Sequence, residues 1–213
     1  MTNLLDDRIK RGKLIVFEGG ESVGKTTVIN ALIQYLTEQG VNFKYFREPG
    51  GCHASEDIRS VIFKHSISVE TEAMLFAAAR AELMSTQIIP LLDAGVHVIL
   101  DRFIMSSLCY QGYVRKMGID TVLSLNKIAI KDYFPDMNIL LDMDPEKALS
   151  RLEGADREVN RFDMAALDFH HEVRAGYLHL AKRFSDTFTI VNADRSSKEV
   201  SEVSIRIVLD NLS

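Results

Sequence analysis

Residues 13–27 read KLIVFEGGESVGKTT and combine a strand pattern, a glycine-containing loop and the start of a helical pattern. A short apolar run, typical of a buried strand, leads directly into a G-x-x-x-x-G-K-T sequence from Gly19 to Thr26, and a helical pattern begins at Lys25. Gly19 and Gly24 let the backbone turn so that successive N–H groups point at phosphate oxygens, and the helix adds its positive end. With a strand before it and a helix after it, the motif predicts a phosphate-binding loop.

Along the rest of the chain, short apolar runs alternate with longer segments of helical period, which is the pattern of an α/β protein with a parallel sheet. We predict five strands flanked by helices on both faces, over residues 13–18, 43–47, 96–101, 137–142 and 187–192. The helices are predicted over residues 25–39, 55–64, 69–94, 103–116, 119–132, 145–152, 164–184 and 197–212. The chain shows no repeat and no linker, so we expect residues 1–213 to form a single domain.

The phosphate loop and a second strand end predict the site of a nucleotide and its metal ion. Contacts to ATP are expected from the loop and the first helical turn, at Gly19, Gly20, Glu21, Ser22, Val23, Gly24, Lys25, Thr26 and Thr27. Lys25 would neutralise the β- and γ-phosphates, and Thr26 would give its hydroxyl to Mg²⁺. The strand over residues 96–101 ends in Asp101, whose carboxylate would help to hold the metal; an ordinary surface aspartate is the alternative. Arg102 beside it suits a second phosphate.

Composition and charge restrict the function classes. The formal net charge of −5 argues against a duplex-binding surface, because phosphate neutralisation needs clustered Lys and Arg. Only two cysteines are present, Cys52 and Cys109, with no spacing for a disulfide framework or a metal site. The polar start of the chain does not resemble a secretory signal. We therefore expect a cytoplasmic protein with no nucleic-acid and no membrane partner.

Two further segments carry candidate chemistry. Phe76 and Arg80 lie four residues apart in a helical pattern with three alanines between them, so a flat base could stack on Phe76 while Arg80 donates to a carbonyl of that base. A core Phe76 and a surface Arg80 are the alternative. Residues 152–163 lose the hydrophobic period and gain charge, which predicts either a lid over ATP or a solvated helix connection. Arg157 and Arg161 in this segment are candidates for the arginine that stabilises the transition state.

No Ser-His-Asp or Cys-His arrangement is legible, and this favours phosphoryl transfer to a phosphate. A phosphate monoester is already mostly a dianion at neutral pH, with a second pKa near 6, so its transfer chemistry depends on positioning and positive charge more than on a general base.

Taken together, these residues resemble the bacterial branch of the thymidylate kinase family. The segments that carry the resemblance are Glu18-Gly19 with the phosphate loop, Arg47-Glu48-Pro49-Gly50-Gly51, residues 72–80, Asp101-Arg102-Phe103, residues 106–112, Pro135-Asp136 and residues 157–163. The resemblance implies magnesium-dependent transfer of the γ-phosphoryl group of ATP to dTMP, and a homodimer formed by helix packing. Met105 and Cys52-His53-Ala54 depart from the family's usual pattern.

The resemblance also implies roles for single residues. Phe76 would stack on thymine, Arg80 and Gln111 would hydrogen-bond its edge, and Ser107 would lie close by. The acceptor phosphate would be surrounded by three arginines, Arg47, Arg59 and Arg102. Glu21 and Glu48 would sit near the sugar and the transferred group, and Tyr110 would crowd the 2′ position so that a ribonucleotide fits poorly. The expected catalytic set is Lys25, Arg102, Arg157, Arg161 and Glu21.

Two other functions remain as alternatives. A deoxynucleoside kinase shares the phosphate loop but needs a carboxylate base to deprotonate a sugar hydroxyl, and it has no use for arginines around an acceptor phosphate. A P-loop NTPase switch would hydrolyse its nucleotide without any small-molecule acceptor, which leaves Phe76, Arg80 and Gln111 unexplained.

Overall fold

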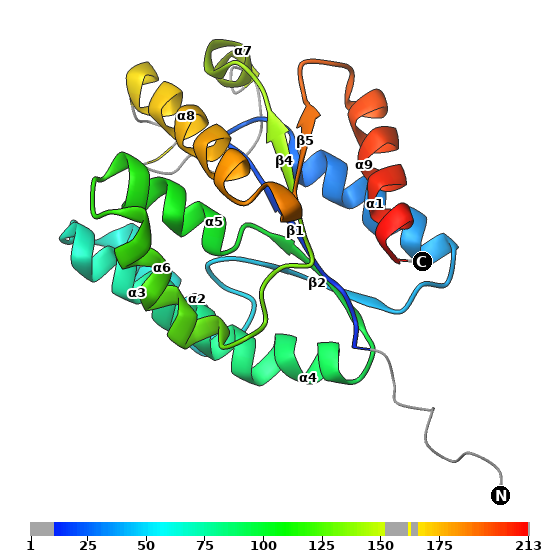
Figure 1. Cartoon of the computed structure of the whole chain (residues 1–213), viewed down its shortest axis with the longest axis horizontal. Coiled ribbons are helices and arrows are strands. Elements are labelled where there is room, and N and C mark those ends of the chain that lie inside the picture. Colours follow the sequence, from blue (N-terminus) through cyan, green and yellow to red (C-terminus); the bar gives the residue numbers. More distant parts are fainter. Residues whose placement is uncertain (1–10, 152–161, 163–165, 213) are drawn as a thin grey trace, which may run out of the picture.

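The computed structural model describes residues 11–151, 162 and 166–212. Its centre is a five-stranded parallel sheet in the order β2-β3-β1-β4-β5 (Figure 1). The strands are β1 (Leu14–Glu18), β2 (Phe43–Arg47), β3 (His97–Asp101), β4 (Met137–Asp142) and β5 (Phe188–Asn192). The five predicted strands are confirmed, with starts that differ by at most one residue. β1, the strand before the phosphate loop, lies in the middle of the sheet.

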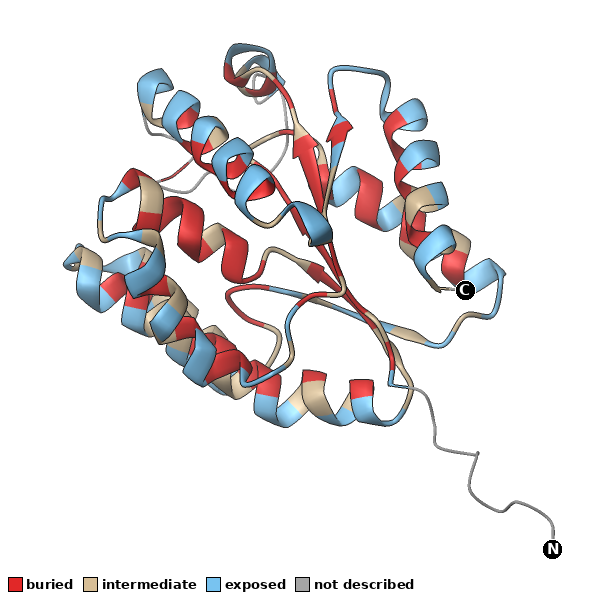
Figure 2. Ribbon diagram, in the orientation of Figure 1, coloured by how far each residue is buried: buried red, intermediate tan, exposed pale blue. Residues whose placement is uncertain are grey.

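Side-chain alternation along β1 explains why helices cover both faces. Ile15 and Phe17 pack on one face with α1 (Lys25–Glu38) and α9 (Ser197–Leu212). Leu14 and Val16 point to the other face. Every residue of β1 is buried, as expected for a central parallel strand, and Figure 2 shows this buried band between the two helical layers.

The second face is covered by a larger group of helices. It includes α3 (Val69–Leu83), the π-helical segment η1 (Met84–Ile88), α4 (Ile89–Asp93), α5 (Ile104–Ser107), the π-helical segment η2 (Leu108–Val114), α6 (Ile119–Ile130) and α8 (Leu167–Arg183). The remaining helical elements are α2 (His53–Lys64), which packs on α3, α7 (Pro145–Ser150), and a short 3₁₀ turn, η3 (Ser185–Thr187). No helix within the described ranges is long and apolar enough to cross a membrane.

Two helices predicted as continuous contain π-helical turns. The helix predicted over residues 69–94 widens at η1, just before Pro90. Proline has no N–H, and its ring needs room at the carbonyl four residues earlier, which a wider turn provides. The helix predicted over residues 103–116 is α5 followed by η2, with wide bonds such as Arg115 N–H to the Tyr110 carbonyl, 2.9 Å. Both segments carry residues of the candidate site or neighbour them.

Candidate active site

The phosphate loop joins the carboxyl end of β1 to α1. Gly24 has φ +96° and precedes the first helical residue, and Ser22 also lies in the left-handed region with φ +59°. A Cβ on Gly19 would approach the carbonyl oxygen of Leu141 to 2.7 Å, so only glycine fits there. The loop therefore holds its amides and the positive end of α1 around one concave space, which suits phosphate.

Lys25 folds back over this loop. Its Nζ donates hydrogen bonds to the carbonyls of Gly19 and Gly20, at 3.1 and 2.7 Å. Burial, and then the neighbouring charge of Arg102, lower the pKa of Lys25 to about 8. The ammonium is therefore still mostly charged at pH 7 but poorly compensated, and a phosphate placed beside it would be stabilised.

Asp101 ends β3 opposite Phe17 of β1, at the edge where the loop begins. Its Oδ1 is buried and has no hydrogen-bond partner among the described residues. Thr26 and Lys25 line the same cleft. A carboxylate and a hydroxyl are hard oxygen donors of the kind that Mg²⁺ takes together with phosphate oxygens and water, so these residues fit the predicted metal. The described part of the chain holds no cluster of three or more His, Cys, Asp or Glu side chains that could bind a metal alone.

The cleft runs from the loop to the turn between β5 and α9 and has a volume of about 740 Å³. Besides residues of the loop and of α1, its lining includes Asp101, Arg102, Arg59, Arg151, Ala193, Arg195, Ser196 and Ser197. The residues from Arg151 onward were not predicted. The four that follow β5, from Ala193 to Ser197, could have been predicted from the sequence. A strand parallel to β1 has its carboxyl end at the same edge of the sheet.

Arg102 lies between the loop and a second pocket. Its backbone is in the left-handed region, with φ +68°, which is uncommon for a residue with a side chain. Its Nη1 donates to the Gly19 carbonyl and to the hydroxyl of Tyr177, each at 3.0 Å, and its Nη2 donates to Glu21 Oε1 at 3.0 Å. The hydroxyl of Tyr110 donates to the same Glu21 oxygen at 2.9 Å. Arg102 is thus held by the oxygen-bearing groups of Gly19, Tyr177 and Glu21, rather than exposed to solvent.

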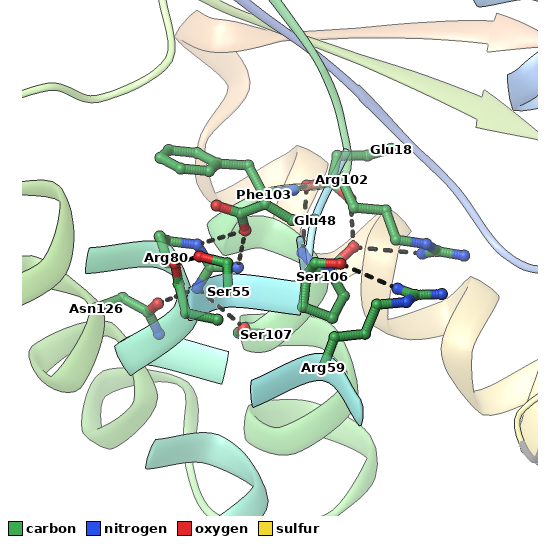
Figure 3. Close-up of polar contacts among 12 residues, drawn as sticks. Glu18, Glu48, Ser55, Arg59, Arg80, Arg102, Phe103, Ser106, Ser107 and Asn126 are labelled. Carbon is green, nitrogen blue, oxygen red and sulfur yellow. Dashed lines mark hydrogen bonds and ion pairs between the residues drawn. The ribbon is translucent and has the colours of Figure 1, made fainter. Parts of the chain in front are cut away.

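Glu18, at the end of β1, holds residues that neighbour Arg102. It is fully buried, and its Oε1 accepts a hydrogen bond from the Phe103 amide at 2.9 Å. Its Oε2 accepts from the hydroxyls of Ser106, 2.7 Å, and Tyr177, 3.0 Å. Burial raises the pKa of Glu18. The contact between Glu18 and Ser106 is visible in Figure 3. Ser106 and Tyr177 were not predicted as site residues, and only their approach in space marks them.

The second pocket is lined by aromatic and polar side chains. Its lining brings together seven of the predicted residues, Glu21, Glu48, Phe76, Arg102, Ser107, Tyr110 and Gln111. Sequence reasoning missed Phe63 and Phe162, which complete the aromatic lining. Tyr110 meets Phe162 edge to face, with ring centroids 5.5 Å apart.

Arg80 is buried, and it is held by side chains from one loop and two helices. Its Nε donates to Glu48 Oε2 at 2.7 Å, and its Nη1 donates to the hydroxyl of Ser107 at 3.2 Å and to the side-chain carbonyl of Asn126 on α6 (Figure 3). Burial raises the pKa of Glu48 to about 7, although Arg80 opposes this shift. Glu48 Oε1 is buried without a partner among the described residues. Asn126 was not predicted.

The other predicted arginines lie elsewhere. The guanidinium of Arg47 donates to the Pro49 carbonyl at 2.9 Å and pairs with Glu56 at 3.0 Å on the surface, and it does not line the pocket. Arg59 donates to the same carbonyl at 3.0 Å and lies over the ring of Phe63, 4.6 Å from its centroid. It lines the phosphate cleft. Arg157, Arg161 and most of the predicted lid over residues 152–163 lie outside the described residues.

Comparisons with known proteins point to one family. The family model described as thymidylate kinase matches residues 17–204. The chain is similar to the thymidylate kinase of Geobacillus sp. (strain WCH70), with 43% identity over 95% of this chain and 98% of the relative. It is also similar to the thymidylate kinases of Bacillus cereus (strain B4264) and Bacillus mycoides (strain KBAB4), with 42% identity over 95% of this chain and 99% of each relative.

Proposed function

Because this chain belongs to the thymidylate kinase family and is a dTMP kinase, we propose that it transfers the γ-phosphoryl group of ATP between the two spaces described above. ATP would lie with its phosphates in the loop and its base toward the turn between β5 and α9. The nucleoside monophosphate would occupy the aromatic pocket, with its phosphate directed at Arg102. The chain would act as one P-loop kinase domain with the lid over residues 152–163.

One observation carries this proposal: Glu21 and Arg102 line both the phosphate cleft and the aromatic pocket. A donor and an acceptor phosphate placed in the two spaces would therefore meet at the same pair of side chains. Transfer in line between them needs this proximity, and a switch that only hydrolyses its nucleotide does not.

On the donor side, Lys25 would move from the loop carbonyls to the β- and γ-phosphates. Its pKa, lowered to about 8 by burial, makes an anion favourable there. The loop amides would hold the remaining phosphate oxygens. Thr26 and Asp101 would hold Mg²⁺, which supplies charge neutralisation across the phosphates when bound.

On the acceptor side, Phe76 would stack on the base, and Gln111 and Arg80 would read its edge. Arg102 would contact the acceptor phosphate, and Glu21 would lie at the sugar and the transferred group. The acceptor is already a dianion at neutral pH, so no base is required. A deoxynucleoside kinase would need a carboxylate facing a sugar hydroxyl. Here Glu21 already accepts hydrogen bonds from Arg102 and Tyr110, which favours a positioning role.

A coupled assay of ADP release tests the proposal, with dTMP, dUMP, dCMP, the ribonucleotide TMP and thymidine as acceptors, each with and without Mg²⁺. We expect turnover with dTMP that requires Mg²⁺, and little with thymidine. Turnover with thymidine above dTMP would favour the deoxynucleoside kinase. ADP release that is independent of any acceptor would favour the switch. A homodimer is proposed on the family resemblance, and sedimentation at assay concentration tests it. A cytoplasmic location is proposed on the two cysteines, which have no disulfide spacing.

A further inference from the structure

A buried hydrogen bond links the proposed base-reading residue to a side chain outside the pocket. Nε2 of Gln111, on η2, donates to Oε1 of Glu72, on α3, at 2.7 Å. Both side chains are 2% exposed. Glu72 does not line the pocket, whereas Gln111 does. The hydrogen bond to Gln111 therefore links Glu72 to the pocket, although Glu72 does not itself line it.

Glu72 shares a helical face with two other proposed base contacts. Glu72, Phe76 and Arg80 follow one another at intervals of four residues along α3. Phe76 provides the flat wall, and Arg80 is held in place by Glu48 at 2.7 Å. The anchor of Gln111 thus lies on the same rigid element as the stacking surface.

The chemistry of a carboxylate fixes which way the amide of Gln111 points. A carboxylate only accepts hydrogen bonds, so it holds the NH₂ end of Gln111 and not the carbonyl end. Among the described residues, no side chain donates to Gln111 Oε1, and this oxygen is the end left for the pocket. An amide held in this orientation presents an acceptor to the ligand.

We propose that Glu72 is a specificity-determining residue that locks the Gln111 amide with its carbonyl toward the base, so that the pocket accepts a pyrimidine with a ring N3–H and rejects one with an unprotonated N3. This inference rests on the proposed function. Thymine and uracil carry a hydrogen on N3 and can donate it to Gln111 Oε1. Cytosine has a lone pair at N3, and two acceptors would face each other.

Cytosine could be accommodated only if the Gln111 amide turned over. Its NH₂ would then donate to cytosine N3, but its carbonyl would face the Glu72 carboxylate inside a buried contact. Facing acceptors in a dry site are unfavourable, and a group left unpaired there weakens binding by roughly ten- to a hundredfold. Glu72 therefore weakens the binding of cytosine, in addition to favouring the binding of thymine and uracil.

The test is the substitution Glu72→Gln, which keeps the size of the side chain but supplies both a donor and an acceptor. When the Gln111 amide turns over in this variant, its carbonyl can accept a hydrogen bond from the new NH₂ group at position 72 instead of facing a carboxylate. We expect kcat/KM for dCMP relative to dTMP to rise by roughly tenfold or more. The ratio for dUMP relative to dTMP should stay within about twofold, because both bases carry N3–H. Glu70→Gln, on the exposed side of α3, is the matched control and should change neither ratio.

The two ratios separate this inference from the function on which it rests. If the wild-type protein uses dCMP as well as dTMP, the proposed base choice is wrong. If the wild type discriminates and folded Glu72→Gln keeps the same dCMP to dTMP ratio, the inference about Glu72 is wrong. Should Glu72→Gln fail to fold, Glu72→Met removes the acceptor with an apolar side chain of similar length, and the same rise is expected. An equal loss with all three nucleotides would also overturn the inference, because it would indicate a purely structural role.

Discussion

At the scale of single residues, the buried charge of Lys25 lowers the stability of the fold, and the same charge is available to bind a phosphate. Its pKa falls from 10.5 to about 8 in the folded protein, mainly through burial. Between these values the unfolded chain holds a proton that the folded chain has released, so stability rises with pH across this window. Below pH 8 the full cost of the buried charge remains.

We therefore expect Lys25→Met to lose nearly all turnover while the protein stays folded. The free energy of unfolding of the wild type, minus that of Lys25→Met, should increase between about pH 8 and pH 10, by up to ~3 kcal/mol. Urea unfolding at a series of pH values measures this difference. A difference that is flat with pH would show that Lys25 titrates normally in the folded state.

Tyr110 gives a second prediction at this scale. Its ring lines the pocket, and its hydroxyl donates to Glu21 at 2.9 Å. Exclusion of the 2′-hydroxyl by the ring is steric, so Tyr110→Phe should keep the preference for dTMP over TMP. Turnover should drop in that variant, because Glu21 loses a donor. Tyr110→Ala should relax the preference by roughly tenfold or more.

The control for Tyr110 is Tyr113→Ala on the same segment. Tyr113 lies near His179, with the rings tilted and their centroids 5.5 Å apart, and it does not line the pocket. The steric explanation is untenable if Tyr110→Ala rejects TMP as strongly as the wild type does.

At the scale of elements, the ion pair between Arg80 and Glu48 connects α3 to the loop that follows β2. Burial raises the pKa of Glu48 to about 7, and the ionised form is the one that grips Arg80. We expect kcat/KM for dTMP to fall as the pH drops through about 7, because protonated Glu48 releases its hold on Arg80.

Glu48→Gln serves as the comparison for that pH profile. The variant should lose the inflection near pH 7 and keep the one near pH 6 that comes from the nucleotide phosphate. An unchanged profile in Glu48→Gln would assign the inflection to another group.

We predict that the arginine that stabilises the transition state comes from residues 152–163. We expect Arg157→Ala or Arg161→Ala to lower the single-turnover transfer rate by roughly a hundredfold or more, with a much smaller effect on ATP affinity. Arg151 is unsuitable as a control, because it lines the phosphate cleft. Arg183, which pairs with Asp120 on the surface at 2.5 Å, is a suitable one. Near-normal transfer rates in both variants would place the arginine elsewhere.

Elements were predicted well from the sequence wherever a period or a motif determines them locally. The strands follow from apolar runs such as residues 14–18, and the phosphate loop follows from its glycines. The π-helical turns were missed because η1 depends on the room that Pro90 needs inside a helix that otherwise continues. The site residues found only in space, Tyr177 and Asn126, are distant in sequence from their partners Glu18 and Arg80. No spacing rule joins residues 159 or 46 positions apart.

At the scale of the whole molecule, the order of the strands in space differs from their order along the chain. β1 and β2 come first in sequence but are not neighbours, because β3 lies between them. The middle strand is therefore the first to be synthesised, and its two neighbours, β3 and β4, come much later.

This ordering has a consequence for the protein as it leaves the ribosome. A nascent chain that ends at Ala94 contains β1 and β2 but no partner for either, and a buried parallel strand without neighbours leaves its backbone polar groups unpaired. A fragment of residues 1–94 should show no cooperative unfolding transition by circular dichroism, whereas the full chain should. A cooperative transition in the fragment would mean that its helices form a stable core without the sheet. If the fragment shows no such transition, the apolar side chains of β1 remain exposed to chaperones and to other chains until residues 97–101 have been translated.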